Sequence, residues 1–141
     1  MQNATVTASM TEYCDLNGQA IVYCRLDGVL YVIAKSVVRA LSATDYLCGE
    51  NPYIHRILAR LPEATRMLPV AGADLLGMVW DNPGEFKDVY FVQAATLVDD
   101  LDTIFPDVSP DRLDAARQVL RAHLMTLERE ERAGQSLESG G

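Results

Sequence analysis

Apolar residues along the chain follow two spacings, one typical of strands and one typical of helices. Two runs rich in Ile, Val, Tyr and Leu, at 20–26 and 29–34, flank an Asp-Gly pair at 27–28. A two-residue Asp-Gly turn between such runs favours a β-hairpin, because both turn positions require a positive φ. With that turn, Cys24 lies opposite Tyr31 on an apolar face. We therefore predict a hairpin that covers a core.

A second pair of strands is predicted at 75–80 and 88–93, with the longer loop 81–87 between them. Asn-Pro-Gly within this loop supplies residues that favour turns. Residues 1–12 are small, polar and without periodicity, and we expect them to form a flexible lead-in.

Helical spacing of apolar residues predicts three short helices, at 36–41, 52–61 and 97–105. Ser36 is expected to cap the first of them. Asn51 precedes a proline at the start of the second helix, which is the arrangement of an N-cap followed by proline at the first helical position.

A longer helix is predicted to begin at Ser109-Pro110 by the same arrangement of cap and proline. Its apolar residues recur every three or four positions and form a narrow stripe, here called the apolar seam: Leu113, Ala116, Leu120, Leu124 and Leu127. The seam can pack on the chain's own sheet or pair with a second copy. We favour a homodimer through this seam, since the helix is longer than a domain of this size needs.

This order of elements predicts an α+β fold, a small antiparallel sheet from two hairpins packed by short helices, with a long C-terminal amphipathic helix. The expected divisions are a lead-in at 1–12, an α+β domain at 13–108, a C-terminal helix at 109–132 and a disordered tail at 133–141.

Composition excludes some classes of protein. The chain has 141 residues, of which 49% are hydrophobic, so intrinsic disorder is not expected. No run approaches the ~18 apolar residues of a membrane span, and residues 1–11 lack the features of a secretory leader. Cys14, Cys24 and Cys48 are odd in number and dispersed, which favours free thiols in a reducing compartment. We therefore expect a cytoplasmic protein.

Motifs for catalysis and metal binding are weak. No glycine-rich phosphate loop and no G-x-S-x-G motif occurs in the sequence. Cys48 and His55 are the one candidate thiol–imidazole pair, and we interpret them as residues without a catalytic role. An acidic run from Asp100 fails as a calcium loop because Phe105 stands where the loop needs glycine. We predict a protein that is not an enzyme, with no metal and no cofactor.

Charge is more informative than motif. The net charge is −8, and residues 81–111 hold eight acidic side chains against Lys87 alone, a net −7. A cluster of one sign attracts a basic partner and repels nucleic acid. The predicted partner-binding residues are the central aspartates of this segment: Asp99, Asp100, Asp102 and Asp107. The alternative interpretation is a solvated helix face.

A second hypothesis uses the more basic segment 36–61. Its arginines, Arg39, Arg56 and Arg60, are the candidate contacts for a sequence-specific DNA-binding module. The acidic balance of the whole chain disfavours nucleic acid as the partner.

Two segments resemble the N-terminal domain of phage antirepressors and baculovirus-repeat proteins, the Bro-N family. Residues 27–41, Asp-Gly-Val-Leu-Tyr-Val-Ile-Ala-Lys-Ser-Val-Val-Arg-Ala-Leu, are similar in register to the family's hairpin and following Val-Ala-Lys-Asp-Val-Ala-x-x-Leu helix. Residues 90–101 are similar to its strand that enters a helix with a Gly-Leu-x-x-Leu step. Ser36 stands where the family has Asp, Ser42-Ala43 replaces its Gly-Tyr, and Ala95 or Thr96 stands at its second-motif glycine.

The resemblance implies a regulatory role in a phage or mobile element. Some members of the family bind DNA, whereas antirepressors bind a repressor protein and disable it. The acidic balance of this chain favours the second branch. We therefore expect a non-enzymatic regulator that occludes a basic protein surface, such as the DNA-reading surface of a repressor or nuclease. The alternative is a Bro-N-type transcriptional regulator that binds DNA through residues 36–61.

Overall fold

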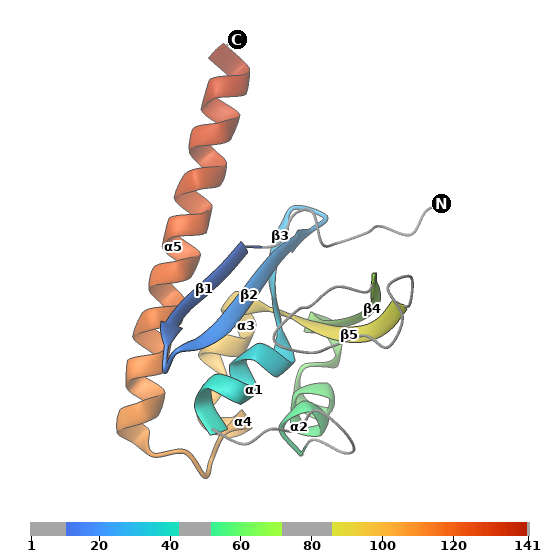
Figure 1. Ribbon diagram of the computed structural model, residues 1–141, viewed down its shortest axis with the longest axis vertical. Coiled ribbons are helices and arrows are strands. Elements are labelled where there is room, and N and C mark those ends of the chain that lie inside the picture. The colour runs from blue at the N-terminus through green and yellow to red at the C-terminus, as the bar shows by residue number, and fades with distance from the viewer. Residues whose placement is uncertain (1–10, 43–51, 72–85, 141) are drawn as a thin grey trace.

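The computed structural model describes residues 11–42, 52–71 and 86–140. These residues form a five-stranded antiparallel sheet with helices, so the predicted α+β class is confirmed (Figure 1). The strand order is β1-β2-β3-β5-β4. The strands are β1 Thr11–Leu16, β2 Gln19–Leu26, β3 Val29–Ile33, β4 Thr65–Ala71 and β5 Phe86–Gln93.

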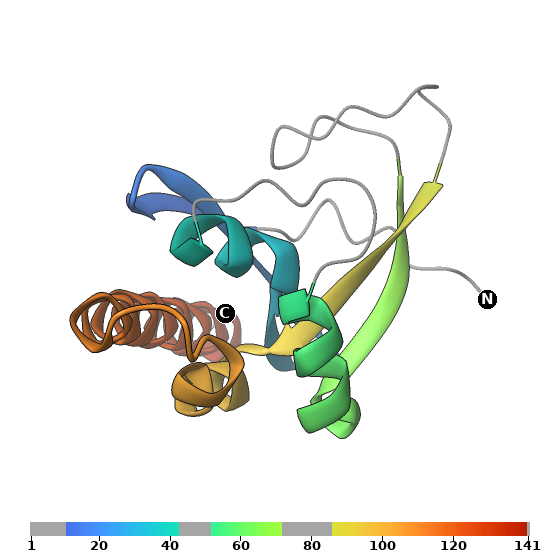
Figure 2. The same cartoon turned by 90° about the horizontal axis from the view of Figure 1, so that it is seen from below.

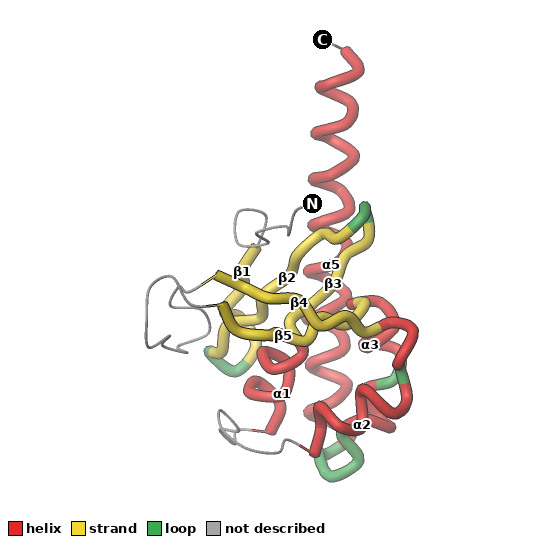
Figure 3. Tube along the Cα trace, turned by 90° about the vertical axis from the view of Figure 1, so that its right-hand side faces the viewer, coloured by secondary structure: helices red, strands yellow, loops and turns green. Residues whose placement is uncertain are grey.

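The helices pack on one face of this sheet, and α5 runs beside α3 and α4 (Figure 2). Figures 1 and 3 show the far end of α5 extending well past the strands. The helical elements are α1 Ala34–Ser42, α2 Pro52–Arg60, the short 3₁₀ turn η2 Pro62–Ala64, α3 Ala94–Asp99, α4 Leu101–Ile104 and α5 Pro110–Gly140.

The predicted first hairpin is confirmed as β2–β3. Cys24 pairs with Tyr31, and the turn residues Asp27 and Gly28 have φ values of 54° and 80°. These positive angles are the reason for Asp-Gly at the turn, since few other residue pairs adopt them at low cost.

A strand precedes this hairpin where we predicted a lead-in to residue 12. β1 begins at Thr11 and reaches β2 through Asn17 and Gly18, whose φ values are 55° and 72°. Asn-Gly favours a hairpin as strongly as Asp-Gly does. The prediction missed β1 because its exposed polar residues hide the alternation. The register of its pairing with β2 shifts between Tyr13 and Leu16.

The strand predicted at 88–93 is confirmed as β5, but its partner differs. β4 pairs with it along its whole length, from Thr65 opposite Val92 to Ala71 opposite Phe86. The partner strand predicted at 75–80 lies outside the described residues. We predicted no element at residues 65–71. Pro69 weakens the strand signal there, yet an edge strand tolerates proline because one row of its N–H groups bonds to no neighbouring strand.

Two of the predicted helices need correction, and the start of a third is confirmed. Ser36 lies inside α1 instead of capping it: its Oγ donates to the Ile33 carbonyl at 2.6 Å and accepts from the Val22 N–H at 3.4 Å. The helix predicted at 97–105 is two short helices, α3 and α4, because the backbone departs from helical geometry at Asp100 (φ −110°, ψ 15°). α5 begins as predicted, with Ser109 Oγ accepting from the Arg112 N–H at 3.3 Å.

α5 also continues to Gly140, through most of the segment 133–141 that we predicted as a disordered tail. No proline interrupts this segment, and an established helix adds residues at little cost once its first turns exist.

The apolar seam lies in the core of the chain itself. Leu113, Ala116, Leu120 and Leu127 are buried and Leu124 is partly buried against the same cluster, which includes sheet and helix residues. Of the two arrangements predicted for the seam, the structure therefore shows packing on the chain's own sheet, and the homodimer stays a prediction. The apolar helix-side face of the sheet already supplies the surface that the seam needs.

The opposite face of the sheet holds a second apolar cluster formed by side chains of β2, β3 and β5. Its members are all buried: Val22, Cys24, Leu26, Tyr31, Ile33, Val89 and Phe91. Both faces of the central strands are therefore apolar, which agrees with the near-continuous run of apolar residues in β2 and β3.

The seam gives a test of this packing. Leu120→Ala should lower the free energy of unfolding by about 2–5 kcal/mol, because it empties a fully buried position. Met125→Ala on the same helix, with Met125 58% exposed, should change it by less than about 0.5 kcal/mol. Urea denaturation followed by circular dichroism measures both. A loss for Leu120→Ala that grows with dilution would instead place the seam between two copies.

Candidate functional site

Three of the four predicted aspartates are exposed, and two of these, Asp99 and Asp102, lie on the surface shared by α3, α4 and α5. Asp99 and Asp102 are each 75% exposed in their side chains. Asp102 Oδ1 lies 2.7 Å from Arg117 Nη2, and Asp99 Oδ1 lies 3.4 Å from Arg121 Nη2. Both arginines belong to α5, so α5 holds these carboxylates in place by charge-assisted hydrogen bonds.

The other two aspartates serve the fold. Asp100 is only 20% exposed and accepts two hydrogen bonds from Arg60 of α2, at 2.8 and 3.3 Å. Asp107 accepts a hydrogen bond from the Tyr53 hydroxyl, and the Tyr53 ring stacks on Phe105 at 4.9 Å. These two carboxylates tie α2 to the segment around α4, and Asp107 is exposed while it does so.

The surface shared by α3, α4 and α5 has a third exposed carboxylate that the prediction missed. Asp114 of α5 is 66% exposed and lies 2.7 Å from Arg117 Nη1, so that one guanidinium joins Asp102 and Asp114. The i, i+3 spacing of Asp114 and Arg117 was visible in the sequence. We call Asp99, Asp102 and Asp114 the acidic surface.

The charge of this surface is smaller than the sequence segment 81–111 indicated. Arg117 and Arg121 lie outside that segment in the sequence but form ion pairs with Asp102 and Asp99. Arg60 of α2 forms an ion pair with Asp100. Hydrogen bonding to Asp102 raises the pKa of Arg117, and hydrogen bonding to Asp100 raises the pKa of Arg60. Arginine is protonated at ordinary pH in any case, so the acidic surface is a set of carboxylates partly neutralised by Arg117 and Arg121.

The three arginines of the DNA-binding hypothesis do not form a free basic face. Arg56 donates to the Ile104 carbonyl at 2.6 Å and lies over the Tyr53 ring at 5.7 Å. Arg60 is paired with Asp100, as described above. Arg39 is half-buried on α1 and has no hydrogen bond or ion pair with another described residue.

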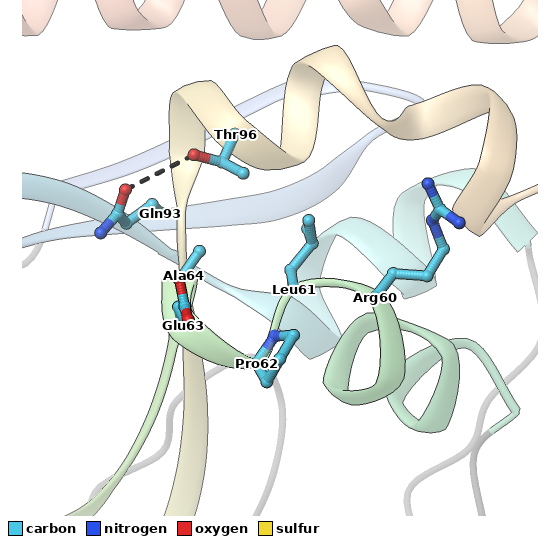
Figure 4. A pocket seen from close by; sticks show the side chains of 7 residues that line it. All are labelled: Arg60, Leu61, Pro62, Glu63, Ala64, Gln93 and Thr96. Atoms are coloured by element: carbon cyan, nitrogen blue, oxygen red, sulfur yellow. Dashed lines mark hydrogen bonds between the residues drawn. The ribbon is translucent and has the colours of Figure 1, made fainter.

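A cleft of about 580 Å³, open to solvent, lies between the end of α2 and the start of α3 (Figure 4). The segment that ends α2 and forms η2 supplies one side, and the junction of β5 and α3 supplies the other. The lining residues are Arg60, Leu61, Pro62, Glu63, Ala64, Gln93 and Thr96. Thr96 Oγ1 donates to Gln93 Oε1 at 3.4 Å, which fixes the polar end of the cleft.

A polar cluster lies between α5 and the sheet, buried at Tyr23 and His123 and exposed at Asp15. His123 is almost wholly buried, with Nδ1 2.9 Å from the Tyr23 hydroxyl and Nε2 2.7 Å from Asp15 Oδ1. Tyr13 stacks on the imidazole at 4.1 Å. Because a carboxylate only accepts hydrogen bonds, Nε2–H donates to Asp15, and Nδ1 is hydrogen-bonded to the Tyr23 hydroxyl. The order Asp–His–Tyr is that of a catalytic triad, but the buried Tyr23 oxygen faces no described cleft.

The thiols and metal ligands give no further site. Cys48 lies outside the described residues, so its predicted relation to His55 is not part of the structure. Cys14 is exposed and Cys24 is buried. Over residues 11–42, 52–71 and 86–140, no three His, Cys, Asp or Glu side chains converge as metal ligands. Among the helices of the same ranges, none has an apolar stretch that could cross a membrane.

No protein-family model matches the chain, and neither the curated proteins nor the solved structures contain a significant match. The resemblance to the Bro-N family therefore stays a prediction, and the functional argument depends on the site itself.

The polar cluster predicts an alkaline loss of stability. Burial raises the pKa of the Tyr23 phenol, and burial followed by the charges of Glu130 and Asp15 raises that of Tyr13. The unfolded chain then releases protons from about pH 10 while the folded chain retains them, so stability is complete below that pH and falls above it. Tyr23→Phe should flatten this fall in urea denaturation between pH 8 and pH 11.

Tyr23→Phe also removes a hydrogen bond, so its stability is lower at neutral pH. Leu124→Ala is the matched control, since it weakens the same interface and keeps both tyrosines. It should retain the alkaline slope of the wild-type protein. Equal slopes for wild type and Tyr23→Phe would contradict the role given to the phenol.

Proposed function

We propose that the chain is a non-enzymatic regulatory protein, of the antirepressor or inhibitor type found in phages and mobile elements, that binds and occludes a basic protein surface. The observation that carries the proposal is the acidic surface, in which Asp99, Asp102 and Asp114 stay 66–75% exposed although each is held by an arginine. Held carboxylates lose less conformational freedom on binding than free ones.

The geometry of these carboxylates supports contact with a cationic partner. In each one, Oδ1 contacts an arginine, and Oδ2 accepts no hydrogen bond from another described residue. A partner's Lys or Arg can therefore bond to the second oxygen without displacing the internal pair. Charge complementarity of this kind accelerates encounter and selects the partner more than it adds affinity.

The internal contacts of Arg56 and Arg60 favour a protein partner over DNA. Their guanidinium groups already donate to Ile104 and Asp100. The net charge of −8 also opposes approach to a phosphate backbone. Binding to a basic protein surface does not require free arginines on this chain, and the net negative charge of the chain favours it.

A fluorescein-labelled deca-lysine peptide tests this proposal. Fluorescence anisotropy at low salt should detect binding by the wild-type protein, and added salt should weaken it. Asp99→Asn with Asp102→Asn should weaken binding about tenfold, or about 1.4 kcal/mol, because two contact charges are lost while the amide oxygens still accept from Arg121 and Arg117.

The matched control is Glu12→Gln with Asp88→Asn, which removes the same net charge from exposed positions on β1 and β5. It should bind the peptide nearly as well as the wild type. The proposal is contradicted if the peptide fails to bind at low salt or if both double variants lose affinity equally. Salt-sensitive binding of a 20-base-pair duplex in its place would favour the DNA-binding alternative.

A further inference from the structure

Among the charged side chains of the cleft beside η2, that of Glu63 forms no ion pair with another described residue. Arg60 stands at its rim, but Asp100 occupies the Nε and Nη2 edge of that guanidinium. Glu63, exposed on η2, forms no hydrogen bond or ion pair with another described residue. The free charge of the cleft is therefore a carboxylate, and the cleft is complementary to a cation.

The walls of the cleft are amphipathic. Leu61, Pro62 and Ala64 supply apolar surface along the α2–η2 side (Figure 4). Gln93 and Thr96 supply polar groups on the other side, and Gln93 Oε1 keeps a second lone pair after accepting from Thr96. A long basic side chain matches this chemistry, because its methylene stem covers apolar surface while its charged end stays among acceptors.

We propose that this cleft receives one lysine or arginine side chain of the protein partner, with the stem against Leu61 and Pro62 and the charged end at Glu63. This inference rests on the proposed function, because it supplies a specific contact for the same basic partner. Short aliphatic or acidic side chains do not satisfy both parts of the cleft.

The cleft and the acidic surface lie on two flanks of α3. Thr96 and Asp100 are four residues apart and face α2, where they border the cleft and its Arg60 rim. Asp99 instead faces Arg121 of α5. A partner that lies across α3 therefore contacts both regions, with one basic side chain inserted and others on the exposed carboxylates.

A single amino-acid probe separates the cleft from the acidic surface. Nα-acetyl-lysine N-methylamide and its arginine counterpart are titrated to tens of millimolar into ¹⁵N-labelled protein. We expect saturable shifts of the amide resonances of Glu63, Ala64, Gln93 and Thr96 with at least one of the two. The norleucine analogue, which has the stem without the charge, should bind at least fivefold more weakly.

Glu63→Gln should weaken the probe at least fivefold, while Glu12→Gln, an exposed charge on β1, should leave it unchanged. Asp99→Asn with Asp102→Asn should also leave the probe unchanged. Equal shifts with norleucine, shifts confined to other residues, or an unaffected Glu63→Gln titration would overturn the cleft assignment. If deca-lysine binds while the probe fails, only the cleft assignment falls; if deca-lysine fails, the proposed function falls.

Discussion

Burial of the apolar seam of α5 against the sheet is the interaction on which the rest of the structure depends. Leu120 and its neighbours fill the core between the sheet and the shorter helices. This packing places Arg117 and Arg121 beside α3 and α4, where they meet Asp102 and Asp99. Hydrophobic burial is non-directional, so the leucines alone do not fix how α5 is rotated about its axis or how far it is shifted along it. The directional hydrogen bonds of His123 with Tyr23 and Asp15 supply that information.

The same arrangement changes how the charge of the chain is understood. A count along the sequence places most of the negative charge in one segment. Such a count does not include the arginines from distant segments that pair with these aspartates in the folded chain. Folding brings Arg60 from 40 residues away to Asp100, and Arg121 from 22 residues away to Asp99. On the surface around α3, folding leaves a small set of exposed carboxylates and a separate cleft whose carboxylate forms no ion pair with another described residue, and both are suited to the basic side chains of the partner that we propose.

Local chemistry predicted much of the fold, and long-range pairing accounts for what it missed. The Asp-Gly turn at 27–28 and the cap at Ser109 act within a few residues, and both were correct. β4 and the break at Asp100 depend on neighbours far along the chain, which propensity does not contain. For the site, the exposed aspartates were identified from charge, whereas the cleft was not, because its walls come from two segments about 30 residues apart.

The two apolar faces of β2 and β3 have a consequence for how this sheet chooses its pairing. In a sheet with one solvent-exposed face, a shift of the strand register by one residue turns the core side chains toward water. The free-energy cost of exposing them disfavours the shifted register. Here a slip exchanges one apolar set for another, so that penalty is weak. The left-handed turn residues at 17–18 and 27–28 therefore carry more of the choice of register here than they would in a sheet with one solvated face.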